Sequence, residues 1–361
     1  MKAIVLAGGR GTRLQPLTHT SNKHLIPIAN RPMIYRVIKD IVDAGITEVI
    51  VNLNVGDTVM PEAIKEMEFP KEVKFHYIEQ PEPNGMMYPI LLAKDIIDGD
   101  DFILHAGDNV LSGGLKKYID EFNDNDSDAH LLVTKVENPE RFGVAVVKDG
   151  VMTKTVEKPK KFVSDLAVTG VYIYRGAKIM EAMEGVDPID PSGTGKKAEY
   201  YPPPAHQYIV DNGGKITVTE VTGWWKDTGK PNDLLLANRL VLEKMEEFKQ
   251  EGKVIDSDIE GGVEIMKGAV VKNSKIRGPV TIGKDAVIED AYIGPYTAIG
   301  DGAEVSNSQI ENSIVMRDAK ILDVSERIDT SLIGIEAIVE TANNKPKAIN
   351  LFVGDRANVR V

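Results

Sequence analysis

Residues 6–14 read Leu-Ala-Gly-Gly-Arg-Gly-Thr-Arg-Leu, and an apolar run at residues 2–7, expected to be a buried strand, leads directly into them. Three glycines in four positions let backbone N–H groups approach a ligand closely. Such a loop at the end of a parallel strand commonly binds an anion. Arg13 and Lys23 add two cations where phosphate oxygens would lie. The stretch therefore predicts a phosphate site, although a tight structural turn would use the same glycines.

The composition narrows the class of protein. A chain of 361 residues, 42% hydrophobic and 27% charged, can form two globular domains. The absence of cysteine excludes disulfides, thiolate metal sites and a cysteine nucleophile. A net charge of −12 argues against non-specific nucleic-acid binding, which needs a basic surface. No apolar run approaches 18 residues and the chain starts with a strand, so we expect no membrane span, no signal peptide and a cytoplasmic location.

The first half of the chain alternates between helical and strand patterns. This alternation predicts βαβ units, a sheet with helices on both faces, and ligands at the strand ends. The helices are expected at residues 32–43, 61–68 and 91–97, and the strands at 48–53, 73–78 and 101–106.

From about Val254 the pattern changes to a six-residue period. Ile276, Ile282 and Ile288 lie six apart, and the same spacing recurs after a one-residue slip between positions 288 and 293. This period predicts a parallel β-helix, made irregular by the slip. Many acyltransferases use such a β-helix with a catalytic histidine, but residues 254–361 contain none. The β-helix is therefore expected to serve assembly or regulation.

Two motifs resemble a known family. The first motif is similar to the signature of the sugar-1-phosphate nucleotidyltransferases and reads Leu-Ala-Gly-Gly-Arg-Gly-Thr-Arg-Leu-Gln-Pro-Leu-Thr at residues 6–18. That signature also includes a lysine, which matches Lys23 in Lys-His-Leu-Ile-Pro-Ile at residues 23–28. Residues 223–231, Gly-Trp-Trp-Lys-Asp-Thr-Gly-Lys-Pro, resemble the long-form glucose-1-phosphate thymidylyltransferases. The resemblance covers nearly the whole chain. It implies a Rossmann-like catalytic domain with a mixed, mostly parallel sheet at 1–245, a linker at 246–254, a left-handed parallel β-helix at 255–361, and a homo-oligomer.

The resemblance also implies a role for each matching residue. The expected catalytic residues are Arg13, Lys23 and Lys158, and the expected Mg²⁺ ligands are Asp108 and Asp227. The expected nucleotide-binding residues are Leu6, Ala7, Gly8, Gly9, Gly11, Thr12, Gln80, Gly85 and Met86. The expected sugar-binding residues are Gly143, Glu157, Thr169, Gly170, Glu199 and Trp225.

Two segments depart from the family pattern. Bulky residues, Met-Met-Tyr-Pro at 86–89, stand where the family has small residues beside the nucleotide. Residues 198–205, Ala-Glu-Tyr-Tyr-Pro-Pro-Pro-Ala, contain three consecutive prolines, from which we expect an extended polyproline segment rather than a helix start. Because Glu199 is expected beside the sugar, the choice of sugar stays open.

The expected reaction joins dTTP to glucose 1-phosphate, with release of pyrophosphate and dependence on Mg²⁺. Alternatives are UTP as the nucleotide, N-acetylglucosamine 1-phosphate as the sugar, or a weakly active paralogue that binds a nucleotide sugar and regulates a partner. An acyltransferase active in the β-helix is a further alternative, disfavoured by the missing histidines. The presence of Arg13, Lys23, Asp108 and Asp227 together favours an active enzyme, because a pure binding protein would not need both metal carboxylates.

Overall fold

The computed structural model describes residues 1–190, 195, 197–341 and 353–359. The chain forms two compact units, and each unit is built from two segments that are separate in the sequence. One unit contains Met1–Gly9 and Ile34–Asp227, and the other contains Arg10–Met33 and Thr228–Val361. The expected division into 1–245, 246–254 and 255–361 stays a prediction.

The first unit is built on a nine-stranded mixed sheet in the order β5-β4-β1-β6-β11-β8-β12-β10-β9. The neighbours from β5 to β6 run parallel, whereas β11 and β10 run antiparallel to the strands beside them. The expected fold class, a mixed α/β sheet, is confirmed. The strands are β1 Lys2–Leu6, β4 Glu48–Asn54, β5 Lys74–Gln80, β6 Phe102–Ala106, β8 Ala129–Lys135, β9 Gly143–Lys148, β10 Val151–Glu157, β11 Leu166–Tyr174 and β12 Ile216–Glu220.

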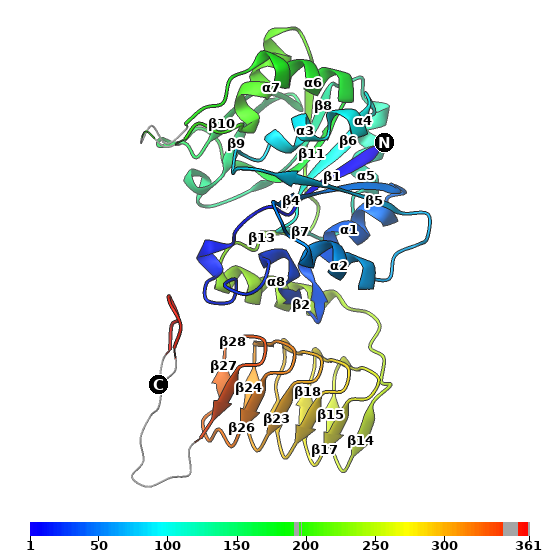
Figure 1. Ribbon diagram of the computed structural model, residues 1–361, viewed down its shortest axis with the longest axis vertical. Coiled ribbons are helices and arrows are strands. Elements are labelled where there is room, and N and C mark those ends of the chain that lie inside the picture. Colours follow the sequence, from blue (N-terminus) through cyan, green and yellow to red (C-terminus); the bar gives the residue numbers. More distant parts are fainter. Residues whose placement is uncertain (191–194, 196, 342–352, 360–361) are drawn as a thin grey trace. The chain divides into compact units, whose positions relative to one another are not determined.

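Helices cover both faces of this sheet. Figure 1 shows α3, α6 and α7 on one face and α1 and α2 on the other. The helices are α1 Met33–Asp43, α2 Val59–Glu66, α3 Tyr88–Leu92, α4 Lys94–Ile97, α5 Lys116–Asp124, α6 Gly176–Gly185 and α7 Pro202–Asp211. The expected helices at 32–43, 61–68 and 91–97 correspond to α1, to α2, and to α3 with α4.

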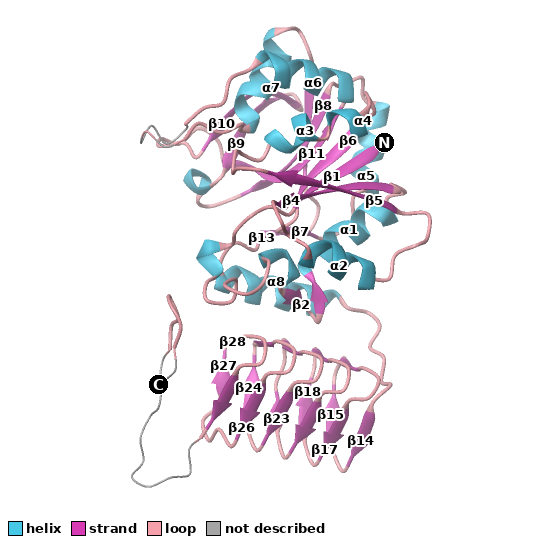
Figure 2. Ribbon diagram, viewed as in Figure 1, coloured by secondary structure: helices cyan, strands magenta, loops and turns pink. Residues whose placement is uncertain are grey.

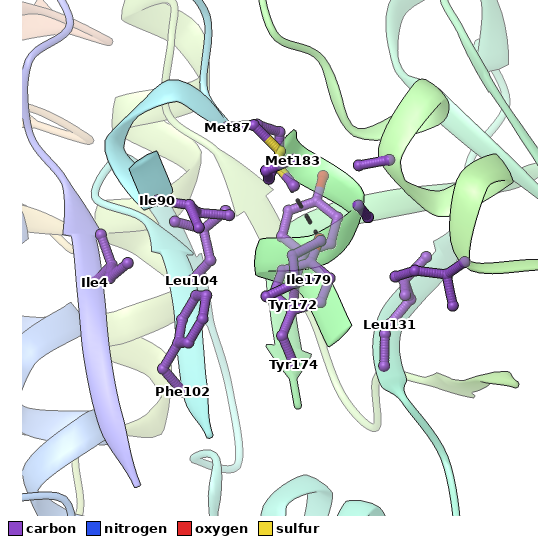
Figure 3. Close-up of a cluster of buried hydrophobic side chains, with 14 of the residues drawn as sticks. Ile4, Met87, Ile90, Phe102, Leu104, Leu131, Tyr172, Tyr174, Ile179 and Met183 are labelled. Atoms are coloured by element: carbon purple, nitrogen blue, oxygen red, sulfur yellow. Dashed lines mark hydrogen bonds between the residues drawn. The ribbon is translucent and has the colours of Figure 1, made fainter. Parts of the chain in front are cut away.

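A buried apolar cluster joins the sheet to α3, α4, α6 and α7. Ile4 and Leu104 contribute from parallel strands, and Met87 from the start of α3. Figure 3 shows Met87 and Met183 close to Tyr174, whose hydroxyl contacts the Met87 sulfur. Apolar residues from strands and helices far apart in the sequence thus form one core on this face of the sheet.

The expectation of an extended polyproline segment at residues 198–205 is wrong. Pro202, Pro203 and Pro204 form the first turn of α7, which follows Tyr201 in an extended conformation. The first N–H groups of a helix have no acceptor within the helix, so proline loses nothing there, and its fixed φ suits the helix.

The second unit contains three parallel sheets that the chain visits in turn, in agreement with the expected left-handed parallel β-helix (Figure 2). Val271, Ile288 and Val305 stack in one sheet, and most coils contain 17 residues. The one-residue slip therefore recurs: in the 17-residue coils, one side is one residue shorter than the other two. The strands run from β14 Lys253–Ile255 to β29 Ile338–Glu340, so β14 begins inside the range 246–254 expected as a linker.

The second unit also holds α8 Pro231–Lys244 and the segment Arg10–Met33. That segment contains two short 3₁₀ turns, η1 Thr12–Leu14 and η2 Lys23–Leu25, and a small hairpin of β2 Pro27–Ile28 and β3 Arg31–Pro32. No helix in the described part of the chain is long and apolar enough to cross a bilayer.

Candidate active site

The Gly-rich loop begins where β1 ends. Ala7 donates its N–H to the carbonyl of Asn52 in β4 at 2.9 Å. A Cβ on Gly8 would lie 3.0 Å from Nδ2 of Asn52, so a side chain would fit there only if Asn52 moved. The predicted nucleotide-binding residues Leu6, Ala7, Gly8 and Gly9 are therefore held close to the neighbouring strand, and all four belong to the first unit.

The rest of the loop belongs to the second unit, where Gly11 is its tightest point. Gly11 has φ +60°, and a Cβ on it would lie 2.8 Å from Cβ of Lys23. Thr18 donates its hydroxyl to the carbonyl of Gly11 at 2.8 Å. Thr12 and Arg13 follow in η1, with Arg13 exposed. The structure thus packs Lys23 directly against the loop that carries Thr12 and Arg13.

The predicted nucleotide-binding residues Gln80, Gly85 and Met86 lie at the end of β5 and just after it, since Gln80 is the last residue of that strand. The side chain of Gln80 accepts a hydrogen bond from Asn52 Nδ2 at 3.1 Å. Gly85 has φ +96°, and a Cβ there would lie 2.5 Å from the carbonyl oxygen of Tyr200, which excludes any other residue. Met86 is half-buried and packs against the core cluster.

Asn52 is a site residue that sequence reasoning missed. Its side chain is buried, it holds Gln80, and it lies against Gly8. No described residue provides a hydrogen bond to its Oδ1 atom. A buried polar atom without a partner is costly, and a ligand that donates a hydrogen bond would remove that cost. The available signal was an asparagine inside the apolar run at residues 49–53.

The two predicted metal ligands come from strands that pair with one another. Asp108 follows β6 and precedes β7 Asn109–Leu111, and Asp227 ends β13 Trp225–Asp227. These two short strands run antiparallel, with Asp227 opposite Asn109. The pairing brings Asp227 to within one position of Asp108 along the facing strand.

Asn109 connects this carboxylate pair to the predicted sugar-binding residues. Its Nδ2 donates to Asp108 Oδ1 at 3.0 Å, and its Oδ1 accepts from the indole N–H of Trp225 at 2.8 Å. The same indole N–H donates to the carbonyl of Thr169 at 2.9 Å. Gly170 has φ +76° and packs against Asn109 and Ala106. The sequence placed Thr169, Gly170 and Trp225 in one pocket but gave Asn109 no role.

The remaining sugar-binding residues lie on β9, β10 and the segment before α7. Gly143 pairs with Glu157 across the strands, and Glu157 forms an ion pair with Lys158 at 2.9 Å. Glu199 is held by a backbone bridge to Ile189. Burial, together with the charges of Glu199 and Glu157, raises the pKa of Tyr201 to about 12. Both carboxylates thus act on one phenol, so Glu157 and Glu199 lie in the same region.

The donor set fits a magnesium ion that shares its coordination with phosphates. Mg²⁺ is commonly held by one or two carboxylates, with waters and substrate oxygens completing the shell. Asp108 and Asp227 would supply these two carboxylates. The described residues contain no group of three or more His, Asp or Glu side chains able to form a cage of protein ligands alone.

The known proteins that this chain resembles in sequence are described as nucleotidyltransferases. A family model described as nucleotidyl transferase matches residues 2–244. A glucose-1-phosphate thymidylyltransferase of Streptomyces griseus is 39% identical over 365 residues, covering 100% of this chain and 99% of the relative. A low-salt glycan biosynthesis nucleotidyltransferase of Haloferax volcanii is 37% identical, with 100% of each chain covered.

Solved structures agree with these relatives in fold. A Bacillus anthracis protein described as a glucose-1-phosphate thymidylyltransferase, solved with sucrose, has a TM-score of 0.61 and 30% identity, covering 69% of this chain and 98% of its own. A UTP-bound UGPase of Acinetobacter baumannii has a TM-score of 0.58 at 22% identity, covering 68% and 94%, which supports the fold alone.

Proposed function

Because the chain belongs to the nucleotidyl transferase family, we propose that it transfers the thymidylyl group of dTTP to glucose 1-phosphate, giving dTDP-glucose and pyrophosphate. The observation that carries this proposal is the pairing of β7 with β13, which brings two carboxylates beside Trp225 and Thr169. The full-length relatives that carry the thymidylyltransferase name support the choice of substrates.

The proposed reaction is a single in-line displacement. A phosphate oxygen of glucose 1-phosphate attacks the α-phosphorus of dTTP, and a new P–O bond forms. The bond from the α-phosphorus to the oxygen bridging the β-phosphate breaks, and pyrophosphate leaves with that electron pair. The attacking oxygen is already ionised, so no protein base is needed, and catalysis depends on positioning and charge neutralisation.

Each proposed role follows from the chemistry of the residue. Backbone N–H groups of residues 8–12 and the guanidinium of Arg13 bind the departing phosphates. Lys23 neutralises charge that develops at the α-phosphorus. Lys158, oriented by Glu157, directs the sugar phosphate. Gln80 and Gly85 contact the base, with Asn52 fixing the Gln80 amide.

Asp108 and Asp227 would hold Mg²⁺, and Asn109 would fix the Asp108 carboxylate. When bound, the ion supplies positive charge that polarises phosphoryl oxygens and offsets the negative charge of the triphosphate.

The sugar region leaves one alternative substrate. Glu157, Glu199 and Tyr201 lie together, and the chain has Tyr-Tyr-Pro-Pro-Pro at 200–204 where the family pattern differs. N-acetylglucosamine 1-phosphate is therefore the second candidate acceptor, and UTP is the second candidate nucleotide.

A substrate panel tests the proposal. The four nucleoside triphosphates are each combined with glucose 1-phosphate and with N-acetylglucosamine 1-phosphate, and pyrophosphate release is measured with and without Mg²⁺. We expect the highest kcat/KM for dTTP with glucose 1-phosphate, and no turnover without a divalent cation. Binding without turnover for every pair would instead support a regulatory nucleotide-sugar-binding protein.

A homo-oligomer built through the β-helix, a cytoplasmic location and the division into domains at 246–254 are parts of the same proposal. Light scattering of the full chain tests the first of these.

A further inference from the structure

The segment that carries Arg13 and Lys23 packs within the same unit as α8 and the β-helix. Its hairpin, β2 with β3, turns at Ala29 and Asn30, which have φ values of +47° and +56°. Residues with side chains rarely adopt this left-handed conformation, so the surrounding structure must hold the turn. The contacts that hold it come from α8 and from one coil of the β-helix.

Asn238 of α8 is the centre of these contacts. Its side chain is fully buried. Its Oδ1 accepts the N–H of Ala29 at 2.8 Å, and its Nδ2 donates to the carbonyl of Tyr296 in the β-helix at 2.9 Å. A second link runs from Asn30 Nδ2 to the carbonyl of Ile299 at 2.7 Å. The buried side-chain amide of Asn238 therefore bridges the hairpin and the β-helix, with its oxygen bound to the hairpin and its nitrogen bound to the β-helix.

The hairpin is in turn connected to Lys23 by short backbone steps. Met33 donates its N–H to the carbonyl of Ile26 at 3.1 Å, and Ile26 donates its own to the carbonyl of Lys23 at 3.2 Å. Cβ of Lys23 lies against Gly11, where any added side chain would collide with it. A shift of the hairpin would therefore move Lys23 relative to Gly11.

We infer that Asn238 is a positioning residue for Lys23, and that the β-helix uses it to hold the segment Arg10–Met33 in its working position. This inference rests on the proposed function, because it gives Lys23 a part in nucleotidyl transfer. It assigns the β-helix a part in catalysis that is independent of any role in assembly.

The first experiment measures the position of the segment without measuring activity. The chain has no cysteine, so Thr20→Cys introduces one labelling site, on an exposed residue three positions before Lys23. A nitroxide attached there reports the mobility of the segment by electron paramagnetic resonance. Two further substitutions are each added to this labelled chain. Asn238→Asp keeps the acceptor and loses the donor, and Asn30→Gly keeps the turn and loses the amide. We expect either one to raise the mobility of the nitroxide.

The second experiment measures steady-state kinetics of the same substitutions in the unlabelled full-length protein. We expect kcat to fall about tenfold for Asn238→Asp, equivalent to about 1.4 kcal/mol in the barrier, with KM for the sugar phosphate changed less than twofold. Asn30→Gly should give a smaller loss in the same parameter. The matched control is Asn232→Asp, an exposed asparagine on the same helix that gains the same charge. It should change neither mobility nor kcat.

Each other outcome overturns the inference. Higher mobility with unchanged kcat would mean that the position of the segment does not matter for the reaction. Lower kcat with unchanged mobility would mean that Asn238 acts by another route. Unchanged mobility and unchanged kcat would leave Asn238 as a packing residue only. Failure of the proposed function is distinguishable, because the wild-type chain would then release no pyrophosphate while the nitroxide arm still reports on the anchor.

Discussion

Asp227 and Asn109 are cross-strand partners in the antiparallel pair of β13 and β7, although they are far apart in the sequence. Asn109 also donates to Asp108 and accepts from Trp225. The Asp108 carboxylate, proposed to hold the metal, is thus joined by one amide to the tryptophan proposed to contact the sugar. The residues proposed for metal binding and for sugar binding therefore lie side by side on the β7–β13 pair.

The carboxylates provide the first prediction. Asp108→Asn and Asp227→Asn should each lower the single-turnover rate at saturating substrates by about a thousandfold or more, because an amide binds Mg²⁺ poorly and metal-assisted catalysis involves several kcal/mol. Circular dichroism should stay unchanged. Asp126→Asn, at an exposed position, is the control and should retain the full rate. A near-normal rate in either variant would contradict the two-carboxylate site.

The amide of Asn109 provides the second prediction. Asn109→Ala removes one acceptor of the Trp225 indole and the donor to Asp108. We expect kcat/KM for the sugar phosphate to fall about tenfold, a loss of about 1.4 kcal/mol, close to the lower end of what one hydrogen bond to a charged group contributes. KM for the nucleotide should not change. The control is Asn125→Ala: Asn125 is exposed, directly follows α5, and donates its side chain to the carbonyl of Glu121 in that helix. Equal losses for both substrates would argue against the link to the sugar.

Gly85 provides a prediction about shape. Gly85→Ala places a Cβ 2.5 Å from the Tyr200 carbonyl oxygen, in addition to the strain of φ +96°. Gly99→Ala is the matched control, since Gly99 has φ +76° and a Cβ there would meet no atom of the described residues within 4 Å. Backbone strain alone should cost about 1 kcal/mol in unfolding free energy. Gly85→Ala should lose clearly more than Gly99→Ala in urea unfolding and should also weaken nucleotide binding. Equal losses would show that Tyr200 moves aside freely.

Met86 provides a prediction about the nucleotide. A long apolar side chain beside the ribose should disfavour the 2′-hydroxyl of UTP, because an unpaired buried hydroxyl costs about 1–3 kcal/mol. We expect dTTP to be preferred over UTP about tenfold or more in kcat/KM, and Met86→Thr to narrow that gap. Met180→Thr is the control, since Met180 packs partly exposed against the same core cluster. A wild-type preference for UTP, or an unchanged ratio in Met86→Thr, would mean that Met86 does not select the nucleotide.

Buried histidines provide a prediction about pH. Burial lowers the pKa of His206 from 6.5 to about 3, and its ring contacts Tyr174 and Thr155. Between about pH 6.5 and pH 3 the unfolded chain therefore binds a proton that the folded chain does not, so stability falls as pH falls, by about 1.4 kcal/mol per pH unit.

His206→Gln removes this titration and keeps an amide near Tyr174. Its unfolding free energy should therefore depend on pH less steeply than that of the wild type between pH 6 and pH 4, whatever its value at pH 7. Urea unfolding at several pH values measures both slopes, and parallel slopes would contradict a neutral buried His206.

The local sequence was sufficient for most of the elements, whereas the chemistry assigned to the main side chains stays a prediction. The glycines at 8, 9 and 11, the alternation of helices and strands, and the six-residue period each depend on interactions between near neighbours. The conformation of Pro202–Pro204 also depends on near neighbours, but three prolines are compatible with two local structures. Whether three prolines extend the chain or start a helix depends on the following residues, and the burial of Ala205 and Ile209 in the core selected the helix.

Contacts between distant parts of the chain were decided only by the tertiary structure. The sequence could name Asp108 and Asp227 as carboxylates of one site, but the register of β7 on β13, and with it the role of Asn109, depends on strands with no sequence proximity. Asn52 and Asn238 look like ordinary polar residues in a strand and a helix, and the roles proposed for them rest on their burial against Gly8 and Ala29. The sequence determines which groups are available, whereas packing determines which of them lose water and must find a partner.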